Sequence, residues 1–170
     1  MCEKVFSIAK DHVPKDYLTI STNSRISSEN NITYFSLGKN TDISAETYPN
    51  HVVLIGNGGF GEIDLNGEKL TLNFGEMIFI PKDTLYGVST KEGFVYTEIL
   101  LKKVEYTMNE LVNAGEVFKL AELLPYEEGS VVNMDIVSND GFKFVIMAFD
   151  QGTGLSEHAA PGEAIIFALE

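Results

Sequence analysis

Residues 51–81 read HVVLIGNGGFGEIDLNGEKLTLNFGEMIFIP, a run of short apolar segments separated by turn residues. At its centre, Asn66-Gly67 is the strongest short signal for a two-residue hairpin turn. The flanking segments, Phe60 to Leu65 and Lys69 to Phe74, place apolar residues at a period of two. This stretch therefore predicts an antiparallel pair of strands, each with one buried face.

Similar segments continue on both sides of this hairpin. Many short strands with regular turns are typical of a sandwich or barrel, so we expect an all-β fold. We expect Gly56 to Gly59 to form a turn between strands, because glycine readily adopts a positive φ. Met77 to Ile80 is wholly apolar and stops at Pro81, which predicts burial on both faces. The other predicted strands are Tyr17 to Ile20, Ile32 to Leu37, His51 to Ile55 and Phe94 to Leu101.

Residues 104–124 have a different pattern. Met108 to Val112 has the composition of a short helix, with Gly115 as its stop. Leu120, Leu123 and Leu124 give a second short helical pattern before Pro125. The stretch is too apolar for a free linker, so we expect a packed connector with short helices.

The strand pattern then resumes. We expect strands at Val131 to Val137 and Phe142 to Phe149, joined by a hairpin turn at Asn139-Asp140-Gly141. A last strand is expected at Ala164 to Leu169.

An internal repeat in the sequence predicts a chain of two related modules. Val5-Phe6 recurs as Val117-Phe118, an offset of 112 residues (117 − 5), and Pro49 recurs as Pro161 at the same offset. We therefore expect a first module at residues 1–103, a connector at 104–124, and the start of a second module at 125–170. The strands after Gly58 have no counterpart in the second copy, and a half barrel would expose unpaired edges. The natural chain is therefore expected to run roughly 45 residues further, or a partner chain to supply those strands.

Two motifs carry a resemblance to a known family. Residues 152–163, GTGLSEHAAPGE, followed by an apolar strand and Glu170, resemble the first conserved motif of small bacterial cupins. Gly75 and Pro81 resemble the start of the second cupin motif. The resemblance covers residues 30–102 and 117–170. It implies a cupin-type jelly-roll (double-stranded β-helix, RmlC-like) barrel with an internal ligand pocket, a bicupin layout and a homodimer.

The resemblance also implies a metal site, which this sequence retains only in part. Cupin motifs supply three histidines and a glutamate, a ligand set that suits Zn, Fe, Ni or Mn. In the second copy His158 matches the first histidine, but Ala160 stands at the second position. Glu163 is acidic and lies closer to His158 than the usual glutamate. A divalent metal held by His158 and Glu163 is therefore one expectation, and a structural His158 hydrogen-bonded at the barrel mouth is the alternative.

The first copy has lost the metal set. Glu46 and Tyr48 align with the two histidine positions of the first motif, and Tyr86 stands where the third histidine would be. We therefore expect no cofactor in the first module, with a Glu46/His51 metal pair as a weaker alternative. The candidate ligand-binding residues are Glu46, Tyr48, Tyr86 and Glu98, whose carboxylates and phenols can hydrogen-bond a small molecule. The alternative reading is that these four are rim or surface groups.

Composition narrows the function further. Lys plus Arg is 12 and Asp plus Glu is 25, so the net charge is −13. Such an acidic chain is not expected to bind nucleic acid or anionic membranes. The single cysteine, Cys2, excludes an intrachain disulfide and a zinc-thiolate cluster. With no signal-peptide pattern at the N-terminus, we expect a cytoplasmic protein.

The sequence thus predicts a small-molecule-binding cupin of unassigned biochemical role with a degenerate metal site. The alternative is a metal-dependent cupin enzyme, an isomerase, decarboxylase or oxygenase, acting from the second barrel. A sensor half of a transcription regulator ranks last, because no helix-turn-helix pattern is visible.

Overall fold

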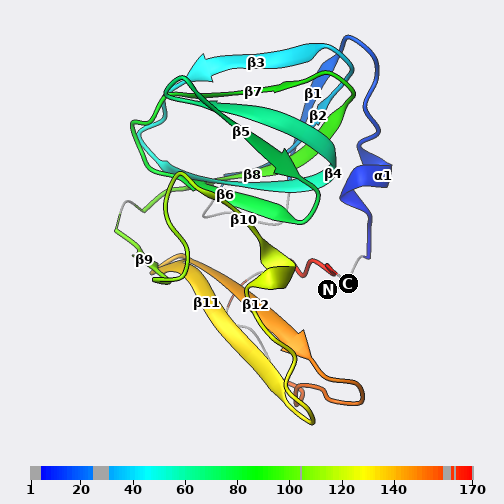
Figure 1. Ribbon diagram of the computed structural model, residues 1–170, viewed down its shortest axis with the longest axis vertical. Coiled ribbons are helices and arrows are strands. Elements are labelled where there is room, and N and C mark those ends of the chain that lie inside the picture. Colours follow the sequence, from blue (N-terminus) through cyan, green and yellow to red (C-terminus); the bar gives the residue numbers. More distant parts are fainter. Residues whose placement is uncertain (1–4, 25–30, 104, 159–161, 163, 170) are drawn as a thin grey trace.

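A barrel of antiparallel strands makes up the upper part of the molecule in Figure 1. The computed structural model describes residues 5–24, 31–103, 105–158, 162 and 164–169. The larger sheet of the barrel has the order β1-β2-β8-β4-β6-β10, so strands distant in sequence lie side by side. Its strands are β1 Thr19–Asn23, β2 Asn31–Leu37, β8 Phe94–Leu101, β4 His51–Leu65, β6 Glu76–Ile80 and β10 Val117–Lys119.

A second, smaller sheet faces the first across the barrel. It contains β3 (Thr41–Glu46), β7 (Tyr86–Thr90), the second half of β4 and β5 (Glu68–Asn73), all antiparallel. The turn between β4 and β5 has φ of 52° at Asn66 and 90° at Gly67, so the predicted hairpin is confirmed. The all-β prediction is confirmed as well.

Strand β4 belongs to both sheets, which corrects the turn predicted at Gly56 to Gly59. The strand runs through these residues with a bulge between Gly56 and Gly58, passing from β8 and β6 on one side to β5 and β7 on the other. A Cβ on Gly56 would collide with the backbone carbonyl of Asn73. The glycines therefore serve a close backbone approach at a barrel corner, where a bulge bends the strand.

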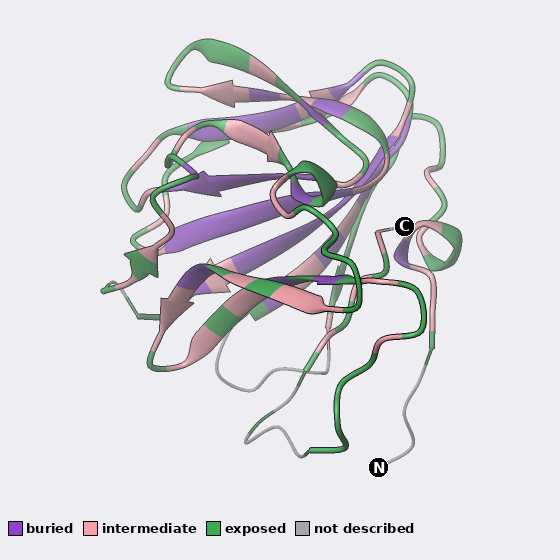
Figure 2. Ribbon diagram, turned by 60° about the horizontal axis from the view of Figure 1, so that its bottom comes forward, coloured by how far each residue is buried: buried purple, intermediate pink, exposed green. Residues whose placement is uncertain are grey.

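The middle strands of the larger sheet, β8, the first half of β4 and β6, are buried on both faces and include purple strands of Figure 2. Alternate residues of β8 illustrate this: Phe94 and Tyr96 point into the barrel, and Val95 and Ile99 point to its outside. All five residues of β6 are buried, so the prediction for Met77 to Ile80 is confirmed. The barrel core is lined by Leu37, Val52, Leu54, Ile63, Leu72, Ile78, Ile80, Tyr86, Val88, Phe94 and Tyr96.

The outer face of the larger sheet packs against a small three-stranded sheet, seen below the barrel in Figure 1. This sheet has the order β12-β11-β9, with bounds Phe142–Phe149, Val131–Asn139 and Thr107–Met108. Its residues Ile136, Val137 and Ile146 share one apolar cluster with Val53 and Phe79 of the barrel. The described residues of the barrel and of the small sheet therefore pack together as one domain.

The expected helical connector is wrong in most of its length. Met108 lies in β9, where it pairs with Val137, and the Asn109 amide donates to the Ile136 carbonyl. Residues 107–109 pair with the edge of β11 instead of forming a helix, because their intrinsic helix propensity is weak. Only a single 3₁₀ turn, η1 at Leu120–Glu122, matches the second predicted helix.

The last predicted strand does not pair with another strand among the described residues. Residues 164–169 alternate in burial, and Ile165, Phe167 and Leu169 pack against the outer apolar cluster. Burial therefore alternates along this segment as predicted, but the segment does not form a strand.

Two hairpins share the same register at the offset of the sequence repeat. In the first, Thr19 pairs with Leu37. In the second, Val131 pairs with Phe149, each partner being 112 residues further along (131 − 19). The short helix α1 (Ile8–Asp11) and η1 begin at positions related by the same offset, and both Ile8 and Leu120 are buried.

Candidate functional site

Two of the four predicted ligand-binding residues meet inside the barrel. Glu98 lies on β8 of the larger sheet, on the same face as Tyr96, and Tyr86 begins β7 of the smaller sheet. The Tyr86 hydroxyl donates a 2.8 Å hydrogen bond to Glu98 Oε2. Glu98 is 7% exposed and Tyr86 5% exposed. This polar link therefore joins the two sheets within an apolar core.

The other two residues sit beside this link and nearer the solvent. Glu46 ends β3 and pairs in register with Tyr86 across the β3–β7 ladder. The Tyr48 hydroxyl donates to Glu46 Oε2 at 3.1 Å, and the rings of Tyr48 and Tyr86 are 5.7 Å apart. Glu46 is exposed and Tyr48 is half-buried, so the cluster reaches the surface through this pair. The four residues chosen from the sequence thus form one connected group.

Burial raises the pKa of the Glu98 carboxyl, and the negative charge of Glu46 raises it further. The hydrogen bond from Tyr86 acts in the opposite direction and lowers the pKa of Glu98. Burial, with the Glu98 charge and the Glu46 hydrogen bond, raises the pKa of Tyr48 to about 12. The pKa of Tyr86 is also raised, by burial first and by Glu98 second. The two phenols therefore remain hydrogen-bond donors, and the Glu98 carboxyl releases its proton less readily than a free glutamate side chain does.

Tyr96 is a member of this group that the sequence analysis missed. It lies two residues before Glu98 on β8, is 1% exposed, and stacks on Phe35 with ring centroids 4.9 Å apart. Burial raises the pKa of Tyr96, followed by the charge of Glu98. No residue of the described ranges forms a hydrogen bond with the Tyr96 hydroxyl. The period of two on β8 was the signal that could have revealed it.

The first-module residues do not fit the divalent metal that the cupin resemblance implies. His51 packs between Phe79 and Tyr106, with ring centroids 5.4 Å and 4.6 Å away, and both neighbours belong to the outer apolar cluster. Its Nδ1 accepts a hydrogen bond from the Lys82 amide at 3.0 Å. Glu46 instead belongs to the group around Glu98, so the alternative Glu46/His51 metal pair finds no support in the geometry.

The second-module metal residues are described only in part. His158 is exposed, and its Nδ1 lies 2.8 Å from the Ser156 carbonyl. Glu163 falls outside the described residues. Within the described ranges no group of three or more His, Cys, Asp or Glu side chains is placed to hold a metal ion.

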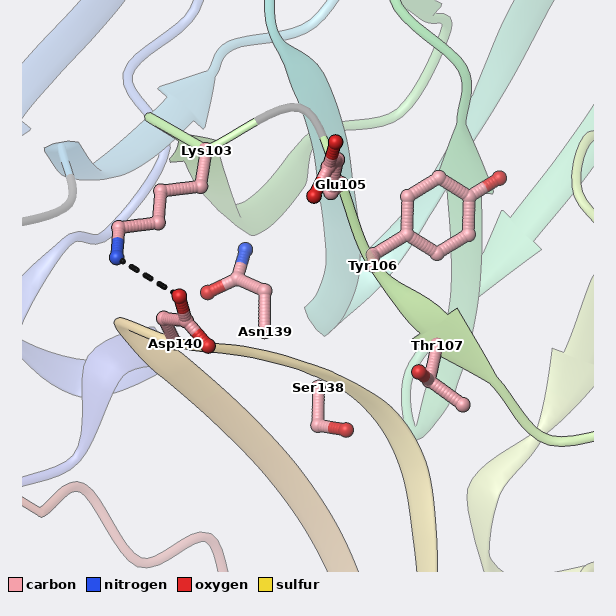
Figure 3. A pocket seen from close by; sticks show the side chains of 7 residues that line it. All are labelled: Lys103, Glu105, Tyr106, Thr107, Ser138, Asn139 and Asp140. Atoms are coloured by element: carbon pink, nitrogen blue, oxygen red, sulfur yellow. Dashed lines mark hydrogen bonds and ion pairs between the residues drawn. The ribbon is translucent and has the colours of Figure 1, made fainter.

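A cleft of about 590 Å³ lies away from these residues, beside the turn between β11 and β12 (Figure 3). Its one ion pair joins Lys103 to Asp140 at 3.4 Å, and both side chains are largely exposed. None of the residues predicted for a site lines this cleft, and we place the candidate site at the buried group instead. The cleft is lined by Lys103, Glu105, Tyr106, Thr107, Ser138, Asn139 and Asp140.

No protein-family model and no curated protein matches this chain. Among solved structures, a cupin 2 conserved barrel domain protein from Leptotrichia buccalis is 25% identical with a TM-score of 0.80, covering 92% of this chain and 70% of that one. A cupin superfamily protein from Desulfitobacterium hafniense is 18% identical with a TM-score of 0.56, covering 61% of this chain and 94% of that one. A protein with a double-stranded β-helix domain from Klebsiella pneumoniae is 16% identical with a TM-score of 0.51, covering 58% and 84%.

These likenesses establish a cupin-type, double-stranded β-helix fold for the barrel, as the sequence motifs implied. In the part of the chain that the structure describes, no helix is both long and apolar enough to cross a membrane.

Proposed function

We propose that this protein binds a small molecule at the barrel group formed by Glu46, Tyr48, Tyr86 and Glu98. The observation that carries the proposal is the buried Glu98 carboxyl, which has one hydrogen-bond donor, Tyr86, among the described residues. A carboxylate offers about four acceptor positions, so most of the acceptor capacity of Glu98 is left for another partner. A ligand that satisfies it would explain why an acid is held in an apolar barrel.

The surroundings of Glu98 support this proposal. Its burial raises its pKa, which costs stability at neutral pH. Perturbed titratable groups of this kind cluster at functional sites. The exposed Glu46 and half-buried Tyr48 give the group a route to solvent. Pockets that combine apolar walls with a few polar groups are the usual sites of small ligands.

Native mass spectrometry of the gently purified protein tests the proposal. We expect a bound small molecule in the wild type that is lost in Glu98→Gln, which removes the charge while keeping the shape. Glu62→Gln is the matched control, because Glu62 forms an exposed ion pair with Lys69. A bound mass that survives in Glu98→Gln, or no bound mass in any of the three proteins, would contradict the proposal.

We also propose that the β11–β12 hairpin is a second copy of the β1–β2 hairpin, within a bicupin-type repeat. The shared register of the two hairpins supports this, because one offset relates both partners of each pair. Hydrogen exchange tests it: we expect β11 and β12 to open together and separately from the barrel strands. A single opening event for the hairpin and the barrel would show that the second copy is not an independent folding unit. The homodimer and the cytoplasmic location stay predictions.

A further inference from the structure

We infer that the barrel group selects an organic cation, a small molecule with a primary ammonium group that takes the Glu98 carboxylate as its counter-ion. The inference rests on the proposed binding function and names the ligand class for the same site.

The charges of the group are all of one sign. The charged and titratable groups that act on Glu98 are Tyr86 and Glu46, and those that act on Tyr48 are Glu98 and Glu46. Those that act on Tyr86 are Glu98, Tyr48 and Tyr96. No lysine, arginine or histidine of the described residues appears in any of these sets. An anionic ligand would thus enter a buried acidic site without a counter-ion, which is strongly unfavourable.

The hydrogen-bond capacity of the group matches an ammonium. A primary ammonium has three donors and no acceptor. The group offers the carboxylates of Glu98 and Glu46, each of which has a phenol as one donor. The Tyr96 hydroxyl is an additional acceptor, because it is nine-tenths or more buried and no described residue hydrogen-bonds with it. A hydroxyl and a carboxylate with acceptor positions to spare are features that a ligand donor would complete.

The aromatic rings favour a cation as well. Tyr48 and Tyr86 lie with ring centroids 5.7 Å apart and an interplanar angle of 39°. The faces of tyrosine rings attract cations, most strongly where water is excluded. The same rings supply apolar contact for the carbon skeleton of the ligand.

Ammonium binding would be linked to proton release. The pKa of Glu98 is raised in the free protein by burial and by the charge of Glu46. A bound ammonium favours the carboxylate and lowers that pKa again. Affinity for an amine should therefore increase as pH rises through the pKa of Glu98, until the amine itself loses its proton.

Isothermal titration calorimetry with two matched sets of probes tests the inference. The first set is benzylamine, benzyl alcohol and benzoate, and the second is n-butylamine, 1-butanol and butyrate. Within each set the skeleton is kept and the charge changes from positive to neutral to negative. We expect the amine of at least one set to bind about tenfold more tightly than its alcohol and acid.

Three variants of the full chain complete the design. Glu98→Gln should weaken amine binding about tenfold or more, Tyr96→Phe should weaken it to a smaller extent, and Glu62→Gln should leave it unchanged. An alcohol or acid that binds the wild type as well as the amine does, and is lost in Glu98→Gln, would overturn the cation while keeping the binding site. Amine binding that persists in Glu98→Gln would overturn the role of Glu98, and absence of binding by both amines would overturn the inference.

Discussion

The Tyr86 hydroxyl, on the smaller sheet of the barrel, donates a 2.8 Å hydrogen bond to the Glu98 carboxylate on the larger sheet. Both side chains are at most 7% exposed. The bond therefore links the two sheets across an apolar core and keeps an ionisable acid within that core. Its contribution to stability and the proposed binding at Glu98 can be measured separately.

Removing the Tyr86 hydroxyl should destabilise the protein. Tyr86→Phe leaves Glu98 without the one donor that the described residues provide, so we expect a loss of about 1–3 kcal/mol in the free energy of unfolding. The pKa of Glu98 should rise further, because the lost bond lowers it. Urea denaturation measures the loss, with Tyr17→Phe at an exposed tyrosine as the control. Equal stability of the two variants would show that the bond contributes little.

Glu98→Gln should change how stability depends on pH. A pKa raised in the folded state gives a contribution that is full below the unfolded pKa and is lost as pH rises through the folded pKa. Glutamine does not titrate, so the unfolding free energy of the variant minus that of the wild type should become more positive between about pH 4 and about pH 8. Urea denaturation at both ends of this range provides the comparison. A difference that stays constant or falls would mean that burial does not raise this pKa.

A methyl group at Gly56 should disrupt the corner of the barrel. In Gly56→Ala the new Cβ would meet the Asn73 carbonyl, a backbone atom that cannot move without shifting a strand. We expect a loss of more than about 2 kcal/mol in unfolding free energy. Gly154→Ala is the control, since no atom lies within 4 Å of its Cβ position. Thermal denaturation that shifts equally in both variants would argue against the tight corner.

The buried His51 and the exposed His158 should respond differently to substitution by alanine. His51→Ala removes a hydrogen-bond acceptor for the Lys82 amide and ring contacts with Phe79 and Tyr106, so we expect a loss of about 2 kcal/mol or more. His158 is exposed, and His158→Ala should change stability by less than about 0.5 kcal/mol.

Elemental analysis of the same His158→Ala protein tests the metal site that the cupin motif implied. We expect its transition-metal content to equal that of the wild type. A stoichiometric metal that disappears in the variant would establish a metal site in the second repeat and revive the enzyme alternative.

The strands with strong periodicity were predictable from the sequence, and those without it were not. Phe94 to Leu101 and Phe142 to Phe149 agree with β8 and β12 in full. Strands β3 and β7 were missed, because TDISAE and YGVST have few apolar residues and owe their pairing to each other and to β4. Tertiary pairing likewise overrode the helix pattern at Met108.

The residues of the candidate site could be predicted from the sequence, but which of their carboxylates is buried could not. Alignment with the cupin motifs selected Glu46, Tyr48 and Tyr86, and the fold brings them together with Glu98. Which carboxylate is buried depends on the pairing of β8 between β2 and β4, which spacing alone does not reveal. Tyr96 was overlooked because its role depends on the same pairing.

The most direct test of the central claim is a map of ligand contacts by NMR in protein labelled with ¹³C in Glu side chains and Tyr rings. Addition of a fragment library, or of the co-purified molecule itself, should shift the signals of Glu98, Tyr86 and Tyr48 together, and leave those of Glu105 and Tyr106 in the outer cleft unchanged. That result would place the ligand in the barrel. Shifts confined to Glu105 and Tyr106 would place it in the cleft and contradict the account.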